Sequence, residues 1–128
     1  MTWLKQRIAV IDDEQDLVQL FAEAIKAHGY DARGFNDPLA AVEHLYLHHS
    51  DYSLVLTDVR MAGIDGFKLA QLVHQMNTKI KIICMSAFEM YDKELRETQM
   101  DEFVKKPIHI TQLINVIRKH LVPEKIVS

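Results

Sequence analysis

The chain has 128 residues, of which 48% are hydrophobic and 26% are charged, as in globular proteins rather than disordered or fibrous ones. This length excludes two domains of ordinary size, so we expect one domain over residues 1–128, with a core at about 7–121 and a tail or linker start at 123–128. The formal net charge of −3 gives no basic excess, which argues against direct nucleic-acid binding.

Short apolar runs alternate along the chain with segments in which apolar residues recur at helical spacing. The runs have the length and composition of buried strands, and the recurring pattern is typical of helices that bury one face. In chain order, the expected strands are residues 8–11, 30–35, 54–57, 80–85 and 102–105. The expected helices are residues 17–25, 38–48, 67–76, 90–98 and 111–121. This alternation predicts an α/β fold, a mostly parallel sheet with right-handed crossover helices on both faces.

Several expected helices begin or end at residues that favour helix boundaries. Gly29 is a stop signal for the first helix, and Asp37 followed by Pro38 combines a capping side chain with a proline in the first turn. Thr111 is the expected cap of the last helix. The fourth helix, at residues 90–98, is expected to be short or irregular.

Polar residues follow four of the expected strands. Asp12 and Asp13 follow the first strand, Asp58 follows the third, Ser86 the fourth and Lys106 the fifth. In open parallel sheets, ligands bind at the carboxyl ends of the strands, near the point where the strand order reverses. We therefore expect these five side chains to converge on one site.

The residue types in this set suit phosphoryl transfer. Three carboxylates in one pocket repel one another unless a cation neutralises them, and oxygen ligands favour Mg²⁺. An ionised aspartate is a competent nucleophile towards phosphorus. A lysine ammonium, a hydroxyl and a metal ion would stabilise the charge on the transferring phosphoryl group.

Four residue pairs, each after its own strand, resemble the motifs of the response-regulator receiver family of two-component signalling: Asp12-Asp13, Thr57-Asp58, Ser86-Ala87 and Lys106-Pro107. The resemblance covers roughly residues 7–121. It implies a doubly wound, flavodoxin-like parallel sheet of strand order 2-1-3-4-5 with five helices. It also implies a signalling switch rather than an enzyme, one that catalyses only its own phosphorylation and dephosphorylation.

The resemblance assigns the acidic residues to the phosphoacceptor and the metal site. Asp58 would be the phosphoacceptor and also a Mg²⁺ ligand. Asp13 would bind Mg²⁺ directly and Asp12 mainly through water. The backbone carbonyl of Arg60 would complete the protein ligands.

The resemblance also implies how the phosphoryl group is held and how its presence is signalled. Lys106 and the hydroxyl of Ser86 would bind phosphoryl oxygens, and Ala87 would offer its backbone N–H. Phe103 occupies the position of the switch aromatic, which turns inward when the serine moves towards the phosphate. The Lys106-Pro107 bond is expected to be cis.

The implied phosphoryl donor is a sensor histidine kinase or a phosphotransfer protein, and the downstream effector or fused output domain is unknown. Two other functions stay open. A receiver-like interaction module that does not depend on phosphorylation would not need the intact acidic residues, Ser86 and Lys106. An aspartyl-nucleophile phosphohydrolase of the haloacid-dehalogenase type would carry a second acid two residues after the nucleophile, where this chain has Arg60.

The chain departs from the family pattern near the site and on the output face. Ala62 replaces the usual proline, whereas the glycine of that loop remains as Gly66. The short span between Ser86 and Lys106 argues against assuming family-typical dimerisation, so we expect a monomer or weak dimer. Long side chains at Arg60 and Phe88 could obstruct water, from which we hypothesise a long-lived phosphoryl state.

The cysteine, the N-terminal segment and the histidines give no further functional site in our interpretation. The one cysteine, Cys84, excludes an internal disulfide and fits a reducing compartment. No long apolar stretch precedes Asp12, so we expect neither a signal peptide nor a membrane anchor and interpret the protein as cytoplasmic. His44 and His48 lie four residues apart, and we favour exposed helix residues over a zinc site.

Overall fold

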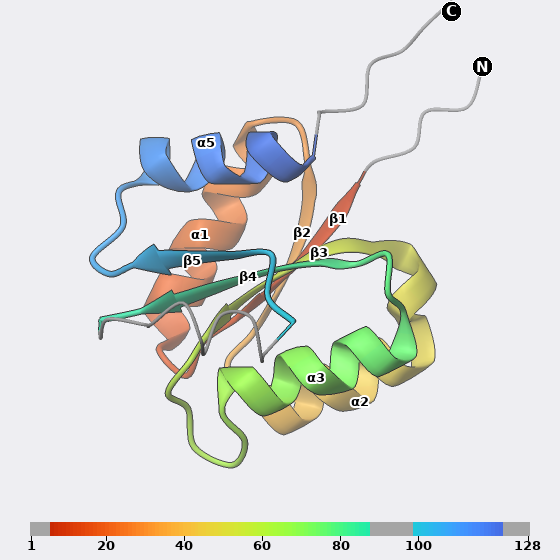
Figure 1. Ribbon diagram of the computed structural model, residues 1–128. Coiled ribbons are helices and arrows are strands. Elements are labelled where there is room, and N and C mark those ends of the chain that lie inside the picture. The colour runs from red at the N-terminus through yellow and green to blue at the C-terminus, as the bar shows by residue number, and fades with distance from the viewer. Residues whose placement is uncertain (1–5, 88–98, 122–128) are drawn as a thin grey trace, which may run out of the picture.

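The computed structural model describes residues 6–87 and 99–121, which form a sheet with helices on both faces (Figure 1). The elements in chain order are β1 (Arg7–Ile11), α1 (Gln15–Ala27), β2 (Asp31–Phe35), α2 (Pro38–His48), the 3-10 helix η1 (His49–Asp51), β3 (Tyr52–Asp58), α3 (Gly66–Met76), β4 (Lys81–Ser86), β5 (Glu102–Lys105) and α5 (Ile110–His120). The helix expected at residues 90–98 lies outside the described residues.

All five strands run parallel in the order β2-β1-β3-β4-β5. The predicted fold class and strand order are therefore confirmed, with four of the five expected helices inside the described ranges. The order reverses between β1 and β3, so the carboxyl ends of these neighbouring strands flank the place where such sheets bind ligands.

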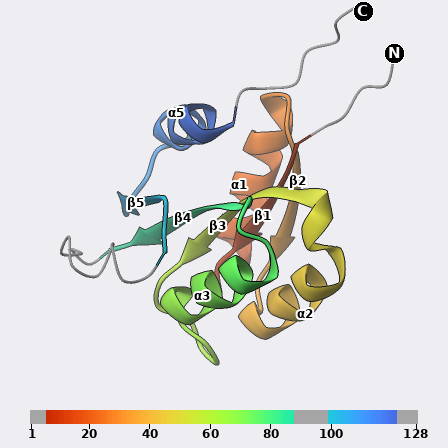
Figure 2. The ribbon, with the colours of Figure 1, turned by 45° about the vertical axis from the view of Figure 1, so that its right-hand side comes forward.

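The sheet separates two hydrophobic cores. Helices α1 and α5 cover one face and α2 and α3 cover the other, as both views show (Figures 1 and 2). Strand β1 serves both cores, because successive side chains of a strand point to opposite faces. Ile8 and Val10 pack with the α1 and α5 side, whereas Ala9 and Ile11 pack with the α2 and α3 side. This explains why the strand is one continuous apolar run.

Two predicted helix boundaries are confirmed and one is wrong. The Asp37 carboxylate caps α2 by accepting the Leu39 N–H at 3.0 Å, and Gly29 follows α1 with a φ of 96°. Thr111, however, is not the cap of α5. The helix begins at Ile110, whose side chain packs against the core, and His109 precedes it without a side-chain capping bond. We attribute the start of α5 to the packing of Ile110 against the core.

Two further observations complete the fold. The Lys106-Pro107 bond is cis, as expected from the resemblance. Within residues 6–87 and 99–121, no helix is both long and apolar enough to cross a membrane.

Candidate functional site

Asp58 is the last residue of β3 and is only 8% exposed. Its carboxylate accepts the backbone N–H of Val59 at 2.8 Å. Helix α3 begins directly against this strand end, where Gly66 donates its N–H to the Val59 carbonyl at 2.7 Å. A Cβ at Gly66 would collide with the backbone carbonyl of Asp58, so the glycine permits this close approach. The loop after Asp58 is thereby anchored to the strand.

The two acids after β1 differ in exposure. Asp12 is completely buried, whereas Asp13 is exposed. The Asp12 backbone N–H donates to the Phe35 carbonyl at 3.1 Å, and its carboxylate accepts the Glu14 N–H at 3.0 Å. The latter bond to the residue two positions ahead is a local turn that aspartate favours. Asp12 is therefore fixed by backbone contacts, and Asp13 faces solvent beside it.

Asp12, Asp13 and Asp58 come together as one acidic cluster. Each offers a carboxylate oxygen, and the three oxygens lie within 4.8 Å of one another. Among residues 6–87 and 99–121, this is the one group of three or more histidine, cysteine or acidic residues with such spacing. An all-carboxylate donor set fits a hard divalent cation that prefers oxygen ligands, such as Mg²⁺.

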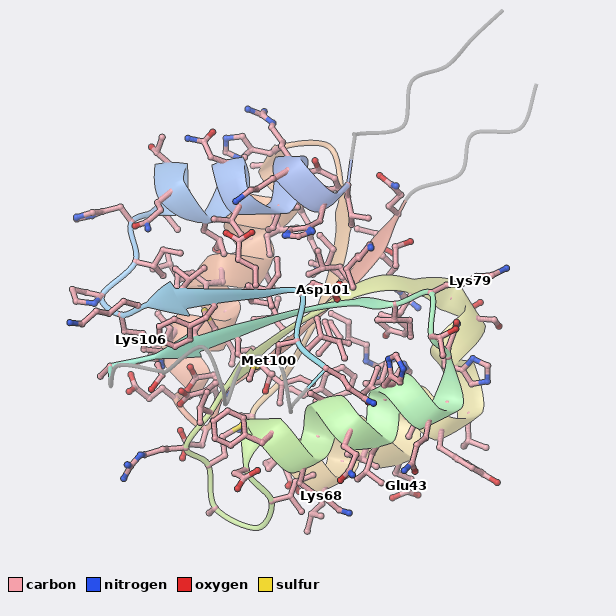
Figure 3. All side chains as sticks on the ribbon, in the orientation of Figure 1. Glu43, Lys68, Lys79, Met100, Asp101 and Lys106 are labelled. Carbon is pink, nitrogen blue, oxygen red and sulfur yellow. The ribbon has the colours of Figure 1, made fainter. Side chains whose placement is uncertain are left out.

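Lys106 lies in the same pocket. Its Nζ donates to Asp12 Oδ2 at 2.8 Å and forms an ion pair with Asp58 Oδ2 at 3.4 Å. Its backbone N–H donates to the Ser86 carbonyl at 2.8 Å, so the end of β5 is tied to the end of β4. Figure 3 shows the labelled Lys106 at this end of the sheet, just after β5. One ammonium therefore neutralises part of the charge of two buried carboxylates.

Burial and neighbouring charge perturb both ionisable partners. Burial raises the pKa of Asp58, and the Asp12 carboxylate raises it further, while Lys106 and the Val59 N–H oppose this only in part. Burial alone would lower the pKa of Lys106. Its hydrogen bond to Asp12 and the charges of both carboxylates outweigh burial, so the pKa of Lys106 is raised. The ammonium stays protonated at neutral pH.

The other residues of the predicted site lie around this pocket. Ser86 ends β4 and is 3% exposed. Arg60 and Ala87 are exposed, and each comes shortly after a strand whose end borders the site. Phe103 is half-buried in β5 and pairs in register with Cys84 of β4. The roles of these four residues stay predictions, and Phe88 lies outside the described residues.

Four contacts of the site were not anticipated from the sequence. The Lys106 ammonium bonds Asp12 more closely than Asp58, and the two residues are 94 positions apart in the chain. The Val59 N–H bonds the phosphoacceptor candidate, and the Thr57 hydroxyl donates to the backbone carbonyl of Asp58 at 2.9 Å. The carboxylate of Asp12 and the Glu14 N–H form a turn that the Asp-Asp pair could have signalled.

The histidines of α2 lie away from this acidic cluster. His44 is half-buried rather than exposed as expected, because its Nε2 lies 2.7 Å from the Tyr52 hydroxyl and its ring packs 5.2 Å from Phe35. Burial is also the main reason that the pKa of His44 is lowered. These contacts give His44 a structural role at the amino end of β3.

The sequence is similar to known proteins over most of its length. The sequence profile of the response regulator receiver domain matches residues 8–118. The response regulator receiver protein CpdR of Brucella abortus is 27% identical over 119 residues, covering 91% of this chain and 98% of that protein. The sensor histidine kinase RcsC of Escherichia coli is 31% identical over 103 residues, covering 79% of this chain but only 11% of that protein.

Solved structures agree on the fold. TrrA of Thermotoga maritima, a response regulator solved in complex with Mg(2+)-BeF, is 28% identical with a TM-score of 0.79, and the match covers 91% of this chain and 99% of that one. The Vibrio cholerae chemotaxis protein CheY4 gives a TM-score of 0.82 at 16% identity, with the same two coverages. The chain belongs to the response regulator receiver domain family of two-component signalling.

Proposed function

We propose that this receiver domain accepts a phosphoryl group on Asp58 from a phosphohistidine of a sensor kinase or phosphotransfer protein, in a Mg²⁺-dependent reaction. The observation that carries the proposal is the cluster itself. A buried carboxylate at the end of β3 lies beside two further carboxylates and within 3.4 Å of a lysine ammonium. This combination provides a nucleophile, an oxygen-rich cation site and a fixed positive charge.

The proposed reaction is a direct displacement at phosphorus. An oxygen of the ionised Asp58 forms a bond to phosphorus, and the bond from phosphorus to the donor imidazole nitrogen breaks. The imidazole nitrogen keeps the electron pair of the broken bond and takes up a proton from solvent, so that neutral imidazole leaves. The Val59 N–H, 2.8 Å from one carboxylate oxygen of Asp58, orients the carboxylate so that its other oxygen can attack.

Lys106 and Ser86 would receive the transferred group. The Lys106 ammonium already lies 3.4 Å from Asp58 Oδ2, so a small movement from Asp12 would bring it to a phosphoryl oxygen. Ser86 ends the strand that pairs with β3, and its hydroxyl would donate to a second oxygen. Both interactions stabilise negative charge as it spreads over the phosphoryl group in the transition state.

Asp12, Asp13 and Asp58, with the backbone carbonyl of Arg60, would hold the Mg²⁺ ion. When bound, the ion supplies positive charge that offsets the repulsion between the incoming phosphoryl group and the three carboxylates. Asp12 is buried, so its carboxylate would be held in a fixed position at the ion site. Asp13 is exposed, so the ion site would be open to solvent on that side.

The state of Asp58 would reach the surface through β4 and β5. Ser86 and Lys105 pair in register at the ends of these strands, and Phe103 lies two residues earlier on β5. We infer that movement of Ser86 towards the phosphoryl group makes room for the Phe103 ring to turn inward. Because Phe103 is half-buried, this turn would change the surface presented by β5.

The proposal is tested by incubating the protein with acetyl phosphate and Mg²⁺ and measuring the intact mass. We expect a base-labile adduct of one phosphoryl group that requires Mg²⁺ and is lost in Asp58→Asn. Asp51→Asn is the matched control, because Asp51 is an exposed aspartate at the opposite end of β3. An adduct that persists in Asp58→Asn, or no adduct in the wild type, would refute the proposal, and rapid multiple turnover of small phosphomonoesters would indicate a hydrolase instead.

A further inference from the structure

Thr57, the residue before Asp58 on β3, carries a hydroxyl in an otherwise apolar part of the strand. Thr57 is completely buried, and the three residues before it, Leu54, Val55 and Leu56, are buried and apolar. A buried hydroxyl costs free energy unless it forms a hydrogen bond, and valine has nearly the same shape without that cost. Packing alone therefore does not account for a threonine at this position.

The partner of this hydroxyl is the backbone carbonyl of Asp58, to which it donates at 2.9 Å. Because threonine is branched at Cβ, few rotamers are open to its side chain, so the hydroxyl is held in place. Gly66, at the start of α3, packs so closely against the same carbonyl that a Cβ on Gly66 would collide with it. The orientation of the Asp58 carbonyl is thus constrained by a residue of the strand and by a residue of the helix.

This carbonyl belongs to the peptide group that joins Asp58 to Val59. A peptide group is planar, and in the trans form its C=O and N–H point in opposite directions. Whatever fixes the carbonyl therefore also fixes the direction of the Val59 N–H. That N–H donates to Asp58 Oδ1 at 2.8 Å, so a continuous chain of contacts leads from the Thr57 hydroxyl to the carboxylate that we propose as the phosphoacceptor.

The Val59 N–H has a second acceptor, the Met85 carbonyl of β4, at 3.0 Å. One hydrogen is thus shared between a side-chain oxygen and a backbone oxygen in a three-centre bond. A small rotation of the peptide group would favour one of these acceptors over the other. A hydrogen bond to the carbonyl also polarises the peptide group and makes its N–H a stronger donor. The Thr57 hydroxyl therefore affects both the direction and the strength of the bond from Val59 to Asp58.

We propose that Thr57 is a positioning residue for phosphorylation of Asp58 and acts through the Asp58–Val59 peptide group, an inference that rests on the proposed function. The peptide N–H holds Oδ1 of Asp58, and Oδ2 stays directed towards Lys106, whose Nζ is 3.4 Å away. An oxygen held in this way needs less reorientation before it attacks phosphorus. Since successive side chains of a strand point to opposite faces, Thr57 points away from the site and acts only through the backbone.

Hydrogen exchange of the Val59 amide, measured by NMR on the full chain, tests the positioning without any phosphoryl donor. Thr57→Val removes the hydroxyl and keeps the shape of the side chain. Relative to the amide of Leu56 in the same strand, we expect Val59 to exchange at least about threefold faster, because a loss of overall stability speeds both amides whereas local loosening speeds only Val59. Thr57→Ser restores a hydroxyl and should bring this ratio back towards the wild-type value. An unchanged ratio in Thr57→Val would overturn the proposal.

The rate of phosphorylation tests the consequence for the reaction. With Mg²⁺ and saturating acetyl phosphate, Thr57→Val should slow formation of the Asp58 adduct about three- to tenfold, and Thr57→Ser should recover most of the wild-type rate. Val55→Ala is the matched control, because it destabilises the same face of β3 without removing a hydroxyl and should leave the rate nearly unchanged.

The outcomes separate the positioning role from the proposed function. Equal rates in Thr57→Val and the wild type, or a loss of rate that serine does not repair, would overturn the positioning role. A loss of rate in Val55→Ala as large as that in Thr57→Val would do the same, because it would trace the effect to stability. A wild type that takes up no phosphoryl group would refute the proposed function, and the exchange ratio of Val59 would still decide whether Thr57 positions the peptide group.

Discussion

Lys106 shows how a single residue can organise the acidic cluster. Its ammonium lies between two buried carboxylates, at 2.8 Å from Asp12 and 3.4 Å from Asp58. The three carboxylates of the cluster nevertheless remain within 4.8 Å of one another, and one ammonium offsets only part of their repulsion. The site is thus less stable electrostatically than a neutral one of the same shape would be.

Removing one of these charges should stabilise the fold. At pH 7 we expect Asp58→Asn to raise the free energy of unfolding by roughly 1 kcal/mol, because the amide keeps the shape of the side chain without its charge. Denaturant unfolding without Mg²⁺ measures the change, and Asp51→Asn should shift stability by less than about 0.5 kcal/mol. Destabilisation by Asp58→Asn would mean that its ion pair with Lys106 outweighs the repulsion.

At the scale of elements, β5 and α5 are joined by an acid held between two basic groups. One carboxylate oxygen of Glu102 lies 2.8 Å from His120 Nε2 and 3.0 Å from Lys119 Nζ. Burial would raise the pKa of Glu102, but hydrogen bonds from His120 and Lys119 and their charges outweigh burial, so its pKa is lowered. The contacts of Glu102 with His120 and Lys119 connect the start of β5 to the end of α5.

This lowered pKa gives a pH dependence with a defined sign. An acid with a depressed folded pKa contributes stability that is present above its unfolded pKa, near 4.5 for glutamate, and lost as the pH falls through the folded value. Glu102→Gln should therefore reduce the free energy of unfolding by about 1 kcal/mol at pH 7, and the difference from wild type should shrink below pH 4.5. Glu23→Gln, at an exposed acid of α1, is the control. A difference that stays constant down to pH 3 would contradict this account.

Element boundaries show where sequence patterns are sufficient and where tertiary packing decides. The cap of α2 was predictable, because Asp37 and Pro38 act within the first turn of the helix. The start of α5 was not predictable from Thr111, because the helix begins at Ile110, which packs against the core, two residues earlier than a cap at Thr111 would place it. Strand β3 also begins two residues before its apolar run, at Tyr52, where the Tyr52 hydroxyl lies 2.7 Å from His44.

At the scale of the whole molecule, parallel strands made most of the site predictable. Once five parallel strands are expected, the acids that follow β1 and β3 must meet at one edge of the sheet, and the structure brings Asp12, Asp13 and Asp58 together. The sequence could not predict that Lys106 would bond Asp12 in preference to Asp58. That choice depends on the relative positions of strand ends far apart in the chain.

The surfaces of the fold differ in composition. The carboxyl edge of the sheet carries the acidic cluster, whereas Leu39, Tyr46 and Leu47 of α2 are exposed on another side of the molecule. At that edge, Asp58 is only 8% exposed. The proposed function depends on which aspartate carries the phosphoryl group.

The most direct measurement is therefore the position of the acyl phosphate in the wild-type chain. After phosphorylation with acetyl phosphate and Mg²⁺, borohydride reduces an aspartyl phosphate to homoserine, and peptide mass spectrometry locates the converted residue. We predict homoserine at Asp58 alone, with Asp12 and Asp13 unchanged. Conversion at Asp12 or Asp13 instead of Asp58, or a phosphorylated protein without any homoserine, would contradict the account.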